Sequence, residues 1–336
     1  MKKLLTCFIC IFISLTCVIG LYACGGKQNE NAVNLVAIDA NVVGLMDDID
    51  YYVVPEPAAS AKVKAIEGLN FAGDLQSLYG GEKGYPQAVV VAKNSLLGTD
   101  ILNEFVTELS SSYEWLVNDE NSVETIVSAI RNHLTSGLEP SIKVGNLTKS
   151  VIKNCGIKFL SATDSKSEIL TFMEKFNSIS ENSFGAPSDG FFYEGGEGSA
   201  EYSQKISVYS PDGAPALGIA KLMAENVLEN VEYHVVDPTT VQTLVGGENP
   251  RADICVLPVN IAVKLLGNAQ NYKLIGTLTH GNLYLLSKGG TQITTANFEN
   301  LKGKRVGVIN LAQVPGLTFK LILKNYGIEF VEEYGN

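Results

Sequence analysis

Residues 205–217 are KISVYSPDGAPAL, and residues 304–317 are KRVGVINLAQVPGL. In both stretches an apolar run is followed by a turn and then by a proline two residues before a leucine. An apolar, β-branched run that ends in a turn and leads into a helical pattern is typical of a βα unit. The first copy continues to ADICVLPVNIA at 252–262, whereas the second reaches Asn336 without an equivalent continuation.

The equivalent continuation lies near the N-terminus. Residues 34–39 are NLVAID, and residues 49–59 are IDYYVVPEPAA. The spacing D-x-x-x-x-P occurs here as Asp50 to Pro55 and in the first copy as Asp253 to Pro258. The repeat therefore predicts two similar α/β units, one of which is divided between the two ends of the sequence.

This division predicts a circularly permuted chain. Residues 303–336 and 33–60 are expected to build one lobe together, and the chain ends are expected to meet on it. Chain termini usually lie at the surface and often close together, so a permutation of this kind is tolerated. A Gly- and Ser-rich stretch at 194–202 is the expected linker between the original ends.

Short apolar runs bounded by Pro, Gly, Asp or Asn predict the strands. They lie at 34–38, 51–54, 88–92, 205–209, 232–236, 253–257, 282–287 and 305–309. Helical patterns separate them, as at 214–228 and 316–327, and such alternation indicates βαβ units with mainly parallel sheets. Residues 97–180 instead predict successive amphipathic helices added to one lobe.

Composition limits the class of function. A chain of 336 residues with 46% hydrophobic content is long enough for two cores. A net charge of -11 with few arginines argues against nucleic-acid binding, which needs clustered basic residues. Its three histidines are scattered without metal-ligand spacing, so we expect no metal site and no cofactor.

The N-terminal segment predicts export. Residues 1–23 combine MKK with a long apolar run, the pattern of a signal peptide, although a retained membrane anchor is the alternative. The sequence LYAC at 21–24 resembles a bacterial lipobox, which implies a lipid on Cys24 and a tether over 24–32. In the folded body only Cys155 and Cys255 remain. Cys255 is expected to be a small buried hydrophobe, and a disulfide between the two stays open.

Longer segments resemble a known family. KISVYSPDGAPALGIAKLMAEN, LIGTLTHGNLYLLS and the stretch from Leu301 to Phe330 look like the first half of solute-binding lipoproteins of ABC importers, in the subgroup for sulfonates, taurine, nitrate and thiamine pyrimidine precursors. The segments around 34–60 and YPQAVVVAKNSLL look like its second half, which here comes first. The resemblance implies a two-lobe, periplasmic-binding-protein-like (type II) α/β fold in permuted order. The expected lobes are 33–87 with 295–336, and 88–193 with 203–294.

The resemblance also implies a function. It implies an extracytoplasmic, lipid-anchored, monomeric protein that is not an enzyme, binds a small solute between its lobes and presents it to a membrane permease. A pyrimidine-precursor synthase-like enzyme of the same fold is one alternative. A sensory or structural module that does not transport is the other.

The expected ligand site lies beyond the carboxyl ends of the strands, where loops and helix N-termini offer polar groups. None of the candidate loops contains Lys or Arg, so their carboxylates favour a neutral or amine-bearing ring, such as an aminopyrimidine, over a sulfonate. Gly316 would let backbone approach the ligand, and one of the two adjacent tyrosines on the strand at 51–54 would face it. The candidate residues are Asp212, Gly213, Asn260, Thr279, His280, Asn282, Asn310, Gln313, Glu56 and Tyr52.

Overall fold

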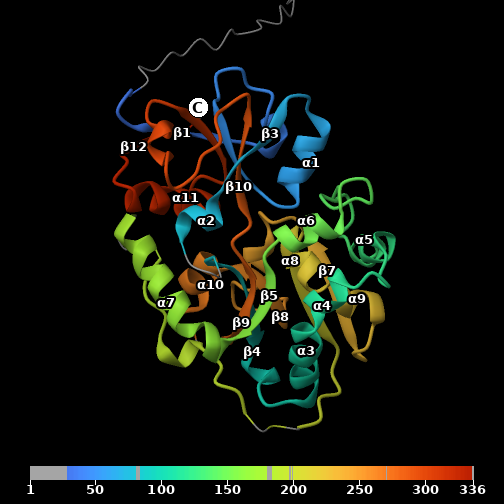
Figure 1. Ribbon diagram of the computed structural model, residues 1–336. Coiled ribbons are helices and arrows are strands. Elements are labelled where there is room, and N and C mark those ends of the chain that lie inside the picture. Colours follow the sequence, from blue (N-terminus) through green and yellow to red (C-terminus); the bar gives the residue numbers. More distant parts are fainter. Residues whose placement is uncertain are drawn as a thin grey trace, which may run out of the picture.

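A computed structural model describes residues 29–80, 84–179, 184–196, 198, 200–269 and 271–334. These residues form two mixed, six-stranded sheets with helices packed on them, an α/β architecture. Figure 1 shows one sheet in its upper part and the other in its lower part. We call the sheets with their helices the upper half and the lower half. Residues 1–28, including Cys24 and the expected signal peptide, lie outside the described residues.

The upper sheet has the order β12-β1-β11-β2-β10-β3. β1 runs parallel to both β12 and β11, and β2 runs parallel to β11. β10 is antiparallel to its neighbours β2 and β3. The strands are β1 (Val33–Ile38), β2 (Tyr51–Pro55), β3 (Leu69–Asp74), β10 (Leu283–Lys288), β11 (Arg305–Ile309) and β12 (Phe330–Glu333).

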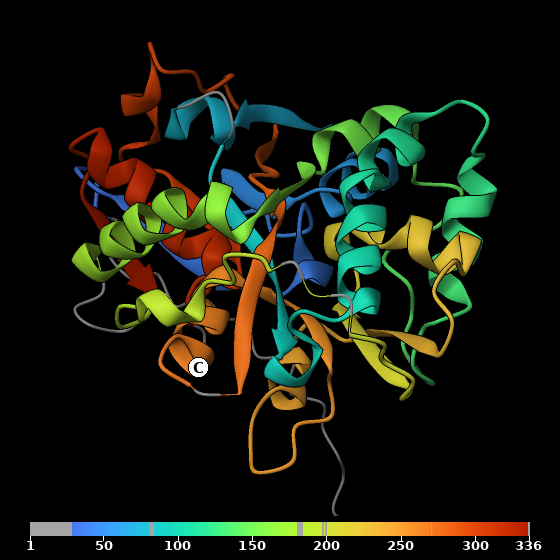
Figure 2. The same ribbon diagram turned by 90° about the horizontal axis from the view of Figure 1, so that it is seen from below.

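The lower sheet has the order β5-β9-β4-β8-β6-β7. β6 runs parallel to β7 and β8, whereas β4 is antiparallel to β8 and β9, and β5 is antiparallel to β9. The strands are β4 (Pro86–Lys93), β5 (Ile157–Ser161), β6 (Ile206–Pro211), β7 (Val231–Val236), β8 (Ile254–Pro258) and β9 (Tyr272–His280). Figure 2 shows β4 and β9 side by side through the lower half.

The α-helices cover both sheets, and α7 lies along α11 where the two halves meet. Five short 3-10 turns complete the described elements. The α-helices are α1 (Ala58–Ala65), α2 (Leu75–Tyr79), α3 (Asp100–Ser110), α4 (Ser112–Val117), α5 (Val123–Arg131), α6 (Lys149–Asn154), α7 (Ala162–Ile179), α8 (Ala214–Gly218), α9 (Ala220–Glu225), α10 (Val259–Leu266) and α11 (Val314–Asn325).

The two copies of the repeat make the same contacts in the two sheets. Asp50 donates its backbone N–H to the carbonyl of Arg305 at 3.0 Å and accepts the Arg305 N–H on its carboxylate at 2.8 Å. Asp253 does the same with Ser207, at 3.0 Å and 2.9 Å. Each aspartate also binds a lysine, Lys304 at 3.2 Å or Lys93 at 2.9 Å. In each half, therefore, the aspartate of the repeated motif joins the strand it precedes to the first strand of the unit.

The two ends of the described chain lie in one sheet. β1 pairs with β12 through Val33 and Phe330, and it pairs with β11 along its length. The two segments that the sequence assigns to one lobe are thus neighbours in the upper sheet. Within the expected linker, Gly198 lies against α3, where Asn103 donates to its carbonyl at 2.6 Å.

The chain passes between the halves twice, once between α2 and β4 and again between β9 and β10. Gln76 ties the two passages together, since its Oε1 accepts the Tyr85 hydroxyl at 3.1 Å and the Leu283 N–H at 2.8 Å. The sequence assigns 203–294 to the lobe of the lower sheet. In the structure β10 pairs with β2 and β3 in the upper sheet, so the return passage comes earlier, between His280 and Leu283.

Each of the eight stretches in which the sequence predicts a strand contains one in the structure. The sequence misses β3, β5, β9 and β12, which lack a clean alternation or a clear turn boundary. The expected helix at 214–228 is divided into α8 and α9, because Ile219 leaves helical geometry at φ -108° and ψ 9°. Among the described residues, the helices are too short or too polar to cross a membrane. Cys155 and Cys255 are buried, free thiols.

Candidate functional site

The loops that follow the parallel strands bring candidate residues from both halves into contact. Asn260, in the first turn of α10, donates its Nδ2 to Oε1 of Gln313 at 3.1 Å. Gln313 immediately precedes α11 in the upper half. Asn260 is 1% exposed, and its Oδ1 has no partner among the described residues. The two helix starts that the sequence places at one site are therefore joined directly.

Glu56 and Asn282 form the second contact. The Glu56 N–H donates to the Asn282 carbonyl at 2.9 Å, and Nδ2 of Asn282 donates to the Glu56 carbonyl at 2.9 Å. Asn282 lies on the return passage between β9 and β10. The turn after β2 is thus fixed to the segment that connects the two halves.

The Glu56 side chain is buried at this boundary, with 1% exposure. One carboxylate oxygen accepts the Ser60 N–H at 2.9 Å, and the other accepts the Ser60 hydroxyl at 2.6 Å. A hydrogen bond from Asn154 of α6 reaches the same carboxylate from the lower half. Burial raises the pKa of Glu56, and the hydrogen bonds from Ser60 and Asn154 oppose that rise.

Thr279 and His280 end β9 and are buried at 1% and 4% exposure. The His280 N–H donates to the carbonyl of Gly156 at 2.7 Å. Gly156 has φ +63°, and a Cβ there would lie 2.3 Å from the His280 carbonyl oxygen. The missing side chain lets the α6–β5 turn lie directly against the passage between the halves.

Asp212 and Gly213 lie at the start of α8, where their polar groups are used within the lower half. The Asp212 carboxylate accepts the Ser141 N–H at 2.6 Å and the Gly213 N–H at 2.9 Å. Gly213 has φ +108°, which favours glycine at this turn. Asp212 therefore anchors the loop around Ser141, which follows α5.

Tyr52 and Gly316 differ from the expected arrangement. The Tyr52 hydroxyl donates to the Met46 carbonyl at 2.8 Å, and its ring is buried with Val43 and Val54 on the other face of the sheet. Asn310 is exposed with φ 55°. Gly316 makes room for backbone of its own chain, because a Cβ there would lie 1.9 Å from the Leu311 carbonyl oxygen.

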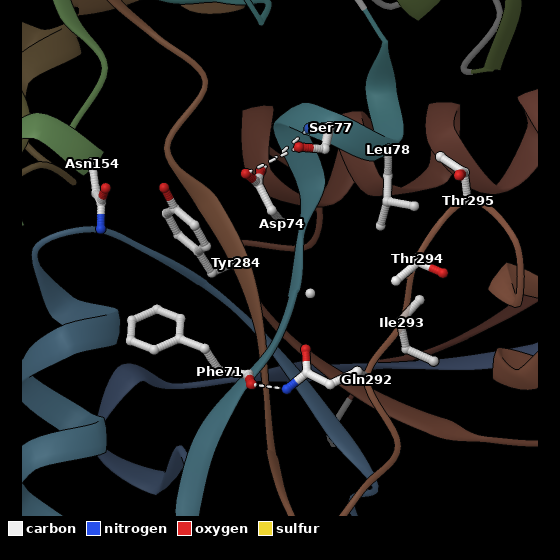
Figure 3. Close-up of a pocket in the computed structure, with 11 residues that line it drawn as sticks. Phe71, Asp74, Ser77, Leu78, Asn154, Tyr284, Gln292, Ile293, Thr294 and Thr295 are labelled. Carbon is white, nitrogen blue, oxygen red and sulfur yellow. Dashed lines mark hydrogen bonds between the residues drawn. The ribbon is translucent and has the colours of Figure 1, made fainter.

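A pocket of about 470 Å³ opens beside these contacts, at the β3 edge of the upper sheet (Figure 3). None of the ten candidate residues is among its lining residues. Asn154 is the contribution of the lower half, and it also contacts Glu56. The lining residues are Phe71, Gly73, Asp74, Ser77, Leu78, Asn154, Tyr284, Gln292, Ile293, Thr294 and Thr295.

The pocket combines aromatic rings with hydrogen-bond acceptors. The Phe71 and Tyr284 rings meet edge to face, with centroids 5.4 Å apart. Burial, followed by the charges of Asp74 and Glu56, raises the pKa of Tyr284, so its hydroxyl keeps its proton. The Asp74 carboxylate accepts the N–H groups of Gln76 and Ser77, at 2.8 Å and 3.2 Å, and thereby caps α2.

Sequence patterns do not reveal this pocket, because it is built on a strand that they do not predict. Asp74 ends that strand, β3, and Asn154 ends a helix far away in the sequence. An aspartate that precedes a short helical run is a recognisable N-cap signal and marks Asp74. Nothing in the sequence places Asn154 beside Tyr284.

The described residues contain no group of three or more His, Cys, Asp or Glu side chains that could hold a metal ion. No model of a known protein family matches the chain, and no curated protein matches it.

Proposed function

We propose that this chain is an extracytoplasmic solute-binding lipoprotein that holds a small molecule between two lobes and delivers it to an ABC permease. The observation that supports this most is the repeated aspartate contact, which builds two equivalent α/β units, one per sheet. Two such units joined by two passages are suited to hinge closure around a ligand. In this proposal the fold is a type II periplasmic-binding-protein fold in circularly permuted order.

In this proposal the expected signal peptide and Cys24 determine where the protein acts. A lipid on Cys24 would anchor the folded body outside the membrane through the tether that follows it. In this proposal the protein acts there as a monomer, whose single pair of lobes would enclose the ligand.

The ligand proposed is an amine-bearing ring of the aminopyrimidine type, with a sulfonate as the second candidate. Among the described lining residues of the 470 Å³ pocket there is no Lys or Arg, whereas Asp74 offers a carboxylate. Phe71 and Tyr284 offer ring faces and edges for a planar ligand. An acceptor-rich, aromatic pocket favours a ligand that donates hydrogen bonds.

A thermal-shift screen of the protein from Cys24 onward tests the proposal. A ligand that binds only the folded state at 100 times its Kd adds about 2.7 kcal/mol to the free energy of unfolding, so it raises the Tm. We expect an aminopyrimidine to do so and taurine to do so less. If pyrimidines, sulfonates, taurine and nitrate all leave the Tm unchanged, the solute-binding proposal fails.

Variants test whether the ligand occupies this pocket. Asp74→Asn keeps an oxygen that can cap α2 but removes the charge, and we expect it to weaken aminopyrimidine binding about tenfold. Tyr284→Leu removes ring and hydroxyl together and should weaken binding similarly. Tyr113→Leu, a partly buried ring packed on the core of the lower half, is the matched control and should leave the Kd unchanged. Unchanged binding in both pocket variants would place the ligand elsewhere.

A further inference from the structure

A second pocket, of about 520 Å³, lies in the lower half at the carboxyl end of β7. It shares no lining residue with the first pocket. The backbone of His133 to Thr135 extends the sheet beside it, since Val235 donates to the His133 carbonyl at 2.7 Å and Thr135 donates to the Val235 carbonyl at 2.9 Å. The pocket walls are therefore fixed to the sheet on one side.

Two stacked rings form one wall. Tyr209 of β6 and His234 of β7 are directly opposite in the parallel register, and their ring centroids lie 4.5 Å apart at 20°. Burial lowers the pKa of His234, and His133 and Lys205 lower it further while Glu232 opposes them. Near neutral pH the wall is thus an uncharged aromatic surface.

An aspartate and an arginine line the same pocket without forming an ion pair with each other. The Asp237 carboxylate accepts the N–H and hydroxyl of Thr239 at 2.8 Å and 2.6 Å, which lowers the pKa of Asp237 and keeps it ionised. Arg251 is exposed, and within the described part of the chain it pairs with no carboxylate, whereas Arg305 binds two. Because Arg251 and Asp237 do not pair with each other, both charges remain available to a ligand.

The hydroxyl groups of three threonines that line the pocket already donate their protons to backbone carbonyls. Thr240 donates to the Asp237 carbonyl at 2.9 Å, Thr243 to the Thr240 carbonyl at 2.7 Å, and Thr135 to the Val235 carbonyl at 3.2 Å. Their oxygens can therefore accept hydrogen bonds from a ligand. Together with Asp237 they favour an ammonium group.

We propose that this pocket binds a free α-amino acid with an apolar side chain. Its carboxylate pairs with Arg251, its ammonium faces Asp237 and the threonine oxygens, and its side chain packs between the Tyr209–His234 wall and the apolar lining residues Leu138 and Leu244. A simple anion fits less well, because Asp237 and the net charge of -11 repel it. This inference does not depend on the solute proposed for the first pocket.

Isothermal titration of the protein from Cys24 onward tests it with L-leucine, L-phenylalanine, isoamylamine and 4-methylpentanoate. We expect both amino acids to bind at least about tenfold more tightly than the amine or the carboxylate, each of which lacks one charged group. Equal binding of L-leucine and isoamylamine overturns the proposal. So does the absence of binding by either amino acid at millimolar concentration.

Single substitutions test which side chain binds the carboxylate of the amino acid and which binds its ammonium group. Arg251→Gln should weaken L-leucine binding at least about tenfold and remove its advantage over isoamylamine. Asp237→Asn, which keeps the oxygen that binds Thr239, should remove the advantage over 4-methylpentanoate. Arg131→Gln, another exposed arginine, is the control for folding and net charge, and Tyr284→Leu should not alter L-leucine binding. If Arg251→Gln binds L-leucine as tightly as the wild type does, the proposal is wrong.

Discussion

Gly316→Ala should lower the free energy of unfolding by about 3 kcal/mol, the upper range for overpacking. The new Cβ would lie 1.9 Å from the Leu311 carbonyl oxygen and 2.4 Å from its carbonyl carbon. Both atoms belong to backbone, so neither can turn aside as a flexible side chain would. In a helix interior, replacing glycine with alanine ordinarily raises the free energy of unfolding by about 1 kcal/mol. We expect the opposite change here because of the steric clash.

Urea unfolding followed by circular dichroism measures this effect. Gly190→Ala is the matched control, because a Cβ at Gly190 meets nothing within 4 Å and its stability should change little. Gly316→Ala should also disturb the Asn260–Gln313 contact, since Gln313 directly precedes α11. A Gly316→Ala protein as stable as the wild type would show that the 310–313 loop is not held against α11.

Glu56→Ala should lower the free energy of unfolding by about 2 kcal/mol, because the Ser60 N–H and hydroxyl lose their acceptors at a part-buried site. Glu56→Gln keeps one acceptor oxygen and should cost less. Glu56→Ala should also loosen the boundary between the halves, since Asn154 of the lower half hydrogen-bonds to the same carboxylate. Glu67→Gln, at an exposed glutamate just after α1, is the control.

The raised pKa of Glu56 predicts the pH dependence of stability. The folded state holds this proton more tightly than the unfolded state, whose carboxyl titrates near 4.5. The free energy of unfolding should therefore fall as the pH rises from about 4.5 through the folded pKa, and this contribution should be constant above it. Glu56→Gln should remove that slope relative to Glu67→Gln. Parallel pH profiles for the two variants would contradict the assignment.

The repeated motif shows how much of the fold the sequence encodes locally. An aspartate before an apolar run and a proline after it predict a strand with a defined start and end, and β2 and β8 follow this pattern. The four missed strands depend on neighbours: β12, for example, is a four-residue strand that pairs with β1 at the edge of the upper sheet. β10 likewise belongs to the upper sheet because of its register with β2 and β3, which no local pattern records.

The candidate site divides in the same way. Asn260, Gln313 and Glu56 follow strands that the sequence predicts, so it could place them at the carboxyl edges of the sheets. The structure joins Asn260 to Gln313 and Glu56 to Asn282. Tyr52 could not be assigned to a face, because both faces of a buried strand carry large side chains. Its hydroxyl binds Met46 on the far side of the sheet.

The sequence by itself determined the α/β class, the repeated unit and the strands that carry it, because apolar periodicity and turn residues act over a few residues. Only the tertiary structure shows which strands share a sheet and that Asn154 lies with Glu56 and Tyr284 beside one pocket. These features depend on contacts between residues far apart in the chain, which form only when the strands pair and the helices pack on them.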